Sequence, residues 1–178
     1  MGISPFKIDE PLHSIVLTVS PIGPVRMVLS LRGLAAIEFG LPSFPQPSIP
    51  IDPRLEPLLL TAQEEIKSYL NGQQREFTLP IDWRVFTPFQ ARVMRVTAAI
   101  PYGEIRTYGQ VASAAGCSKA YRAVGGVMAR NPIPIVIPCH RVIGSSRELH
   151  GYSAPGGLET KAWLLQLEGH QIEHQRLV

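Results

Sequence analysis

The stretch NPIPIVIPCHRV, residues 131–142, decides how the second half of the chain is organised. Three prolines each remove a backbone donor and fix φ at about −65°; these are Pro132, Pro134 and Pro138. The residues that precede them are pushed toward extended conformations. Because the prolines disfavour a helix and most of their neighbours are apolar, we expect a stiff, buried, strand-like segment that leads to Cys139.

Cys139 is followed directly by His140 and Arg141. Cysteine attacks as a thiolate, and a neighbouring base or cation can bring the pKa of the thiol below about 8.5. Adjacent residues on a regular strand face opposite sides, so Cys139 and His140 cooperate only if the chain turns there or a water bridges them. A buried structural cysteine is the ordinary alternative in an apolar run. The Pro-Cys-His-Arg context favours the nucleophile.

The pentapeptide at residues 138–142, Pro-Cys-His-Arg-Val, resembles the active-site motif of the O6-alkylguanine-DNA alkyltransferases. The resemblance extends from Phe89 to Gly169 and includes the segment from Lys119 to Met128. It implies direct-reversal DNA repair, in which the alkyl group of a flipped-out O6-alkylguanine moves to Cys139, stoichiometrically and irreversibly. O4-alkylthymine is a further candidate substrate. It also implies double-stranded DNA containing alkylated guanine, bound through the minor groove, as the partner of a monomer without a cofactor.

The same resemblance assigns catalytic roles. Cys139 is the nucleophile, His140 acts on its proton through water, and Glu168 orients the histidine. Asn131 completes the catalytic set. Tyr108 or a water protonates the guanine that leaves.

DNA-binding and pocket residues follow from the resemblance as well. Arg122 enters the base stack in place of the flipped nucleotide, and Tyr108 helps to rotate that nucleotide into the pocket. The remaining DNA-binding residues lie near Arg122: Lys119, Ala123 and Gly125. The remaining pocket residues are Met128, Val142, Tyr152 and Ser153. The loop Ser153-Ala154-Pro155-Gly156 is longer than the compact glycine-rich form of many relatives, which affects the shape expected for the pocket.

Charge is distributed unevenly along the chain, whose formal net charge is +3. Residues 1–86 hold seven basic and nine acidic residues, whereas residues 87–178 hold ten and five. Between Phe89 and Arg147 there are eight basic residues and a single acidic one, Glu104. A concentrated basic segment suits a polyanion such as DNA, although a solvated basic face gives the same composition.

Residues 1–86 predict a small α/β domain. Three apolar runs with turn residues between them predict an antiparallel sheet; the runs are Ser14–Ser20, Val25–Ser30 and Leu34–Phe39. The proline-rich stretch Leu41–Pro57 predicts a loop. Leu58–Leu70 has helical spacing and is followed by Gly72 as a cap. Phe77, Leu79 and Ile81 alternate like one more strand.

Residues 87–178 predict a mainly α-helical domain with a helix-turn-helix. Thr87-Pro88 begins a helix that Pro101 ends, and Thr107-x-x-Gln110 is a capping box for a short second helix. Gly116 closes that helix and Ser118 is placed to cap the next, Lys119–Arg130, which completes the helix-turn-helix pattern. A last helix, Leu158–Glu168, ends at Gly169.

The helix expected at Lys119–Arg130 has little side-chain bulk, and its small residues are Ala120, Ala123, Gly125, Gly126 and Ala129. Each glycine costs up to about 1 kcal/mol relative to alanine in a helix interior. Close packing against residues 131–142 is one explanation. A slim helix that fits into a DNA groove is the other, and the resemblance implies the minor groove.

Cys117 and Cys139 are the only cysteines of the chain, so a disulfide framework is excluded. The histidines and cysteines show no paired-ligand spacing, and we expect no metal. No apolar run reaches the roughly 20 residues that span a bilayer. We expect a cytoplasmic protein, or a nuclear one in a eukaryote.

Two other functions fit parts of the sequence. A lesion-binding protein without catalysis would share the basic helix, but such proteins carry another residue in place of Cys139. An unrelated Cys-His hydrolase would need a hydrolysable acyl intermediate and gives no reason for a basic helix rich in alanine and glycine. Alkyl transfer to Cys139 explains these features together.

Overall fold

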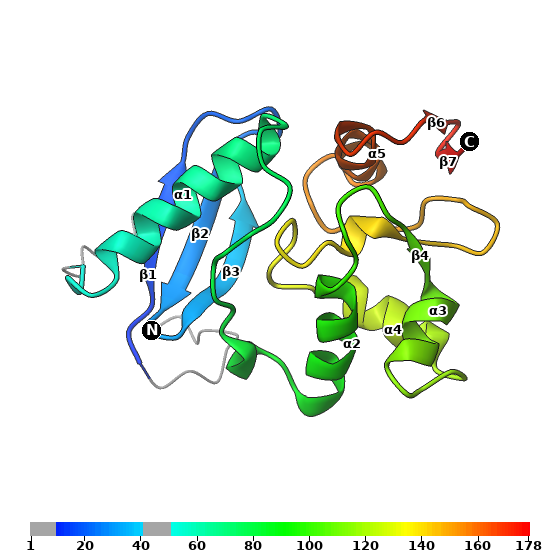
Figure 1. Cartoon of the computed structure of the whole chain (residues 1–178), viewed down its shortest axis with the longest axis horizontal. Coiled ribbons are helices and arrows are strands. Elements are labelled where there is room, and N and C mark those ends of the chain that lie inside the picture. The colour runs from blue at the N-terminus through cyan, green and yellow to red at the C-terminus, as the bar shows by residue number, and fades with distance from the viewer. Residues whose placement is uncertain (1–9, 41–50) are drawn as a thin grey trace. The chain divides into compact units, whose positions relative to one another are not determined.

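The computed structural model describes residues 10–40 and 51–178, and the chain divides into two compact units, Met1–Thr87 and Pro88–Val178. In the first unit three strands form an antiparallel sheet in the order β1-β2-β3. They are β1 (His13–Leu17), β2 (Val25–Ser30) and β3 (Gly33–Phe39). Helix α1 (Glu56–Leu70) lies across one face of this sheet (Figure 1). The predicted sheet and helix are therefore confirmed.

The core of the first unit forms where β2 and β3 meet α1. β2 and β3 are almost entirely buried, and a register irregularity at Val28/Leu29 interrupts their pairing. Leu59, Ala62 and Ile66 line the buried face of α1, at the spacing expected of an amphipathic helix. Within the predicted proline-rich loop, residues 41–50 lie outside the described residues.

The strand expected at Phe77–Ile81 does not form, except for one parallel bridge between Leu34 and Ile81. The backbone N–H groups of Thr78 and Leu79 donate instead to the buried carboxylate of Glu65, at 3.0 and 3.3 Å. These two N–H groups therefore cannot donate to a neighbouring strand, as they would in a sheet. The apolar residues alternate as in a strand, but hydrogen bonds to Glu65 on α1 hold the backbone in a different conformation.

The second unit contains four helices within the described residues: α2 (Pro88–Ala98), α3 (Tyr108–Ala114), α4 (Tyr121–Met128) and α5 (Leu158–Leu167). A short parallel pair joins β4 (Arg106–Thr107) to β5 (Val142–Ile143). The 3₁₀ helix η1 (Trp83–Val85) precedes this unit, and η2 (Cys139–Arg141) lies within it. The predicted capping box is present, because the Thr107 hydroxyl accepts from Gln110 N and the Gln110 side chain accepts from Thr107 N.

Helix α4 is shorter than expected. It begins at Tyr121, its N-cap is Ala120, and no side chain caps it, so the expected cap at Ser118 is wrong. The Ser118 hydroxyl lies 3.5 Å from that of Ser113, on the preceding helix. Gly116 takes a left-handed φ of 71° in the turn between the two helices, a conformation that suits glycine.

Residues 131–142 are buried as predicted, but they do not form a strand-like segment. Ile135 takes a left-handed φ of 74°, and the chain folds back through hydrogen bonds from Val136 N to Pro134 O and from Ile137 N to Ile133 O. A β-branched residue rarely adopts this conformation. The packed surroundings hold it, because Ile133, Ile135 and Ile137 are fully buried. The coil satisfies its own backbone donors without a sheet.

The end of the chain is held by a small apolar cluster. Ile143, Leu149, Leu165 and Leu177 are buried together, with Leu158 and Ala162 packed against them. Helix α5 thus buries the side of the helix that carries Leu158, Ala162 and Leu165. The sequence did not predict the two-stranded hairpin of β6 (Ile172–Glu173) and β7 (Arg176–Leu177), whose turn residues His174 and Gln175 both have positive φ.

Candidate active site

Cys139 begins the 3₁₀ turn η2, so the chain does turn where the thiol and the imidazole meet. Arg141 N donates to Pro138 O at 2.9 Å, and Cys139 N donates to Ile137 O at 2.8 Å. The thiol is only 5% exposed. The geometric condition for cooperation between Cys139 and His140 is met, because a tight turn replaces the alternation of a regular strand.

Asn131 is the polar neighbour of the thiol. Its side-chain Nδ2 lies 3.2 Å from Cys139 Sγ and donates to Ile137 O at 2.9 Å. Its Oδ1 accepts from Ile133 N at 3.0 Å, which fixes the orientation of the amide. One side chain therefore ties the buried coil to the sulfur and offers it a hydrogen-bond donor.

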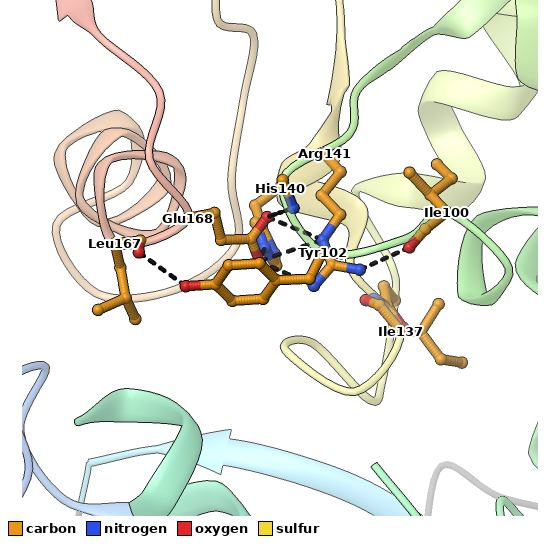
Figure 2. Close-up of polar contacts among 9 residues, drawn as sticks. Ile100, Tyr102, Ile137, His140, Arg141, Leu167 and Glu168 are labelled. Atoms are coloured by element: carbon orange, nitrogen blue, oxygen red, sulfur yellow. Dashed lines mark hydrogen bonds and ion pairs between the residues drawn. The ribbon is translucent and has the colours of Figure 1, made fainter. Parts of the chain in front are cut away.

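Glu168 closes the site from the C-cap of α5 (Figure 2). Its carboxylate lies 2.9 Å from His140 Nε2 and accepts from Arg141 Nη2 at 2.8 Å and Arg141 Nε at 2.9 Å. All three side chains are buried. The structure brings together the four residues proposed for catalysis, and it adds a second partner of the glutamate, the cationic Arg141.

Arg141 is itself held on its remaining sides. Its Nη1 donates to Ile100 O at 2.5 Å, and its guanidinium carbon lies 5.8 Å from the centroid of the Tyr102 ring. The Tyr102 hydroxyl donates to Leu167 O at 2.7 Å, next to Glu168 (Figure 2). Arg141 therefore belongs to the interior, and it must be removed from the basic residues counted toward a DNA-binding surface.

Burial dominates the protonation of the thiol and the imidazole. It raises the pKa of Cys139, although the Asn131 hydrogen bond and the charge of Lys161 oppose the shift. It lowers the pKa of His140, against the opposing effect of Glu168. The expected depression of the thiol pKa is thus wrong for the resting protein. The resting pair is a neutral thiol beside a neutral imidazole.

The partner of His140 determines its tautomer. A carboxylate only accepts hydrogen bonds, so the nitrogen that faces Glu168, Nε2, carries the proton. Nδ1 is then the acceptor nitrogen of the ring. An imidazole in this state can receive a proton from a thiol.

Sequence reasoning missed Lys161, a lysine on the buried face of α5 that is only 1% exposed. Its ammonium donates to Val142 O at 2.7 Å and to His150 O at 2.9 Å. Burial lowers its pKa to about 8, and ionisation of Cys139 to the thiolate would oppose that shift. Its spacing three and four residues before Leu164 and Leu165 was the available signal.

A pocket of about 280 Å³ lies beside the site and is lined by Tyr108, Tyr121, Gly125, Met128, Ala129, His150 and Gly151. Burial raises the pKa of the Tyr108 phenol, and a thiolate at Cys139 would raise it further, so the phenol stays protonated beside the nucleophile. Val142, Tyr152 and Ser153 do not line the pocket. Val142 is buried, Tyr152 is half-buried and Ser153 is exposed.

The residues expected to touch DNA lie on the outer side of α4 and just before it. Lys119, Arg122 and Ala123 are exposed, and the Arg122 guanidinium carbon lies 5.7 Å from the centroid of the Tyr121 ring. A Cβ at Gly125 would lie 4.0 Å from Tyr108 Cε1, an ordinary contact distance. Close packing within the second unit therefore does not explain Gly125.

Cys117 is half-buried in the turn between α3 and α4. Across residues 10–40 and 51–178, no cluster of three or more His, Cys, Asp and Glu side chains could hold a metal ion. In the same ranges, no helix is long and apolar enough to cross a membrane.

Comparisons with known proteins agree with this geometry. Residues 88–170 match the family model described as 6-O-methylguanine DNA methyltransferase, DNA binding domain. The methylated-DNA–protein-cysteine methyltransferase of Mycobacterium leprae is 47% identical over 111 residues, 62% of this chain and 66% of that relative. That of Methanosarcina barkeri is 40% identical over 154 residues, 86% of this chain and 95% of the relative.

The fold agrees as well. A crystal structure of Mycobacterium tuberculosis OGT in complex with DNA is 38% identical in sequence and superposes with a TM-score of 0.72. It covers 88% of this chain and 91% of the other. The similarity therefore extends over both units of the chain.

Proposed function

We propose that this chain, which belongs to the methylated-DNA–protein-cysteine methyltransferase family, repairs O6-alkylguanine in DNA by moving the alkyl group to Cys139. The observation that supports this assignment most strongly is the buried set of Cys139, Asn131, His140 and Glu168 next to the Tyr108 pocket. We assign catalysis to the second unit, residues 88–178, and a supporting role to the first.

The first step is activation of the thiol. The Cys139 proton passes to Nδ1 of His140 through a bridging water, and Glu168 stabilises the imidazolium through Nε2. Asn131 Nδ2 and the nearby Lys161 ammonium stabilise the thiolate that remains. This charge separation occurs in a buried site, where fixed dipoles and charges act strongly.

The second step is an in-line displacement. Cys139 Sγ forms a bond to the alkyl carbon, the bond from that carbon to O6 breaks, and its electron pair stays on the guanine. Tyr108 or a water supplies the proton that the guanine takes up. The product is a thioether, which has no carbonyl that water can attack, so no further step restores the thiol. Each chain therefore acts once.

DNA reaches this pocket through α4 in our proposal. The helix begins at Tyr121 and carries the exposed Arg122 and Ala123, with Lys119 just before it. A base flipped out of the duplex from its minor-groove side would enter between Tyr108 and Met128, and Arg122 would fill the space left in the stack. The DNA complex of the M. tuberculosis relative supports DNA as the partner. We propose that a monomer suffices.

The test is to locate the alkyl group after the reaction. The protein is incubated with a duplex that carries one O6-methylguanine, and its peptides are then analysed by mass spectrometry. We expect S-methylation of Cys139 and none of Cys117, complete loss of labelling in Cys139→Ala, and full labelling in Cys117→Ala. Methyl transfer to another residue, or transfer by Cys139→Ala, would refute the proposal.

A further inference from the structure

His150 forms one wall of the pocket, although nothing in its sequence context marked it. Its side chain lines the cavity with Tyr108 and Met128. The centroids of the His150 and Tyr108 rings are 6.4 Å apart, with the ring planes inclined by 45°. Aromatic pairs contact one another at about 4.5–7 Å. The two rings therefore contact each other, and together they form one side of the pocket that a flipped base would enter.

Gly144 gives the imidazole its place. A Cβ at residue 144 would lie 2.6 Å from Nε2 and 2.9 Å from Cδ2 of His150, distances that real Cβ atoms do not show. Gly144 does not have a positive φ, so backbone conformation does not require glycine there. Glycine is required instead because the His150 ring occupies the space that a side chain at residue 144 would need.

Lys161 fixes the backbone of this wall. Its buried ammonium donates at once to His150 O and to Val142 O, and Val142 directly follows the catalytic turn. One cation thus ties the wall of the pocket to the segment that carries Cys139. The backbone of His150 is thereby positioned relative to the nucleophile, and its ring, on a residue that is exposed to solvent, lies against Gly144.

We propose that His150 determines the size of the alkyl group that this protein accepts, by narrowing the pocket beside Tyr108. The inference rests on the proposed transfer to Cys139 and adds a specificity-determining residue to it. At about 280 Å³ the pocket is slightly smaller than typical small-molecule sites, which range from roughly 300 to 1,000 Å³. A guanine with a small O6 substituent fits such a space better than one with an aryl group.

The experiment compares two duplexes that differ only in the lesion, O6-methylguanine or O6-benzylguanine. Rate constants for labelling of Cys139 are measured by intact mass for the parent and for His150→Ala. We expect the ratio of benzyl to methyl rates to rise by about tenfold or more, since small differences of bulk in a pocket change rates by about 10–200-fold. DNA contacts are the same in both duplexes and cancel in the ratio. Ser145→Ala, an exposed change in the same loop, should leave the ratio unchanged.

A second variant tests the mechanism without removing the histidine. Gly144→Ala must displace the imidazole, so it should change the ratio in the parent. It should add nothing in the His150→Ala background, where the next nearest atom, Glu148 O, lies at a tolerable 3.4 Å. An unchanged ratio in His150→Ala, or equal effects of Gly144→Ala in both backgrounds, would overturn the inference. If the parent does not methylate Cys139 at all, the proposed function fails instead.

Discussion

Replacing Glu168 by glutamine removes one charge from the buried cluster while preserving the shape of the side chain. Glu168 is 6% exposed and Arg141 is 5% exposed, so the guanidinium would stay buried opposite a neutral amide. Removing one partner of a buried ion pair costs about 3–5 kcal/mol. Since domains are stable by about 5–15 kcal/mol, the variant should fold but unfold at a clearly lower urea concentration.

The same change acts on the reaction through His140. An amide can donate to Nε2 or accept from it, so the imidazole loses the partner that fixes its tautomer. Nδ1 no longer remains the acceptor in every molecule, and the thiol loses part of its base. Failure of acid–base catalysis lowers rates by about 10²–10⁴-fold. We expect a loss of this size in the labelling of Cys139.

A double variant separates the two effects. Glu168→Gln combined with Arg141→Met removes the uncompensated cation, so its free energy of unfolding should fall by less than the sum of the single changes. Its labelling rate should stay low, because His140 still lacks the carboxylate. Urea unfolding measures the first quantity. Intact mass after reaction with free O6-methylguanine base, under conditions where each variant is folded, measures the second.

Two outcomes would refute this interpretation of the cluster. One is a Glu168→Gln variant that unfolds at the urea concentration of the parent. The other is a folded Glu168→Gln variant that labels Cys139 at the parent rate.

Three more predictions follow from the site. Burial lowers the pKa of His140, so the imidazole remains neutral and can act as a base at pH values below its ordinary pKa of about 6.5. The transfer rate should therefore stay constant as the pH falls through about 6.5 and decline only in more acidic buffer. A decline centred on about pH 6.5 would contradict the role of His140 as the base. Lys161→Met should lower the free energy of unfolding by about 1–3 kcal/mol for each carbonyl left without its donor and slow the alkylation of Cys139 by iodoacetamide, while Lys119→Met, an exposed control, should do neither. Arg122→Ala should slow reaction with a methylated duplex more than with free O6-methylguanine, because only the duplex must be unstacked; equal losses would exclude its role in the stack.

Local signals predicted much of the second unit. The capping box at Thr107 and the glycines after α3 and α5 act within one helical turn, so the sequence contains nearly all the information that sets these boundaries. Ser118 shows the limit of such signals. It has the side chain of a cap, yet the helix begins three residues later, at Tyr121.

Long-range packing decided what local signals left open. The prolines of residues 131–142 favour an extended chain, but the coil forms because Ile135 is held in a left-handed conformation by buried neighbours. The backbone N–H groups of Thr78 and Leu79 donate to the carboxylate of Glu65 on α1 instead of to a neighbouring strand. Both features depend on packing between residues that are distant in the sequence, and local sequence patterns do not predict such contacts.

The candidate site divides in the same way. Cys139, His140 and Glu168 could be named because the motif and the resemblance placed them. Arg141 was counted with the surface charges, since composition does not distinguish a buried guanidinium from an exposed one. Lys161 was passed over because lysine is rarely fully buried.

The most direct test of irreversible transfer to Cys139 is a titration. A fixed amount of protein is mixed with increasing amounts of a duplex that carries one O6-methylguanine, and repaired DNA and intact protein mass are measured together at the end of the reaction. We predict that repaired DNA rises until it equals the protein and then stops, and that every chain then carries one added methyl group, located at Cys139. Repair of more DNA molecules than there are protein chains would contradict irreversible transfer to Cys139. So would repair without a stable change in protein mass.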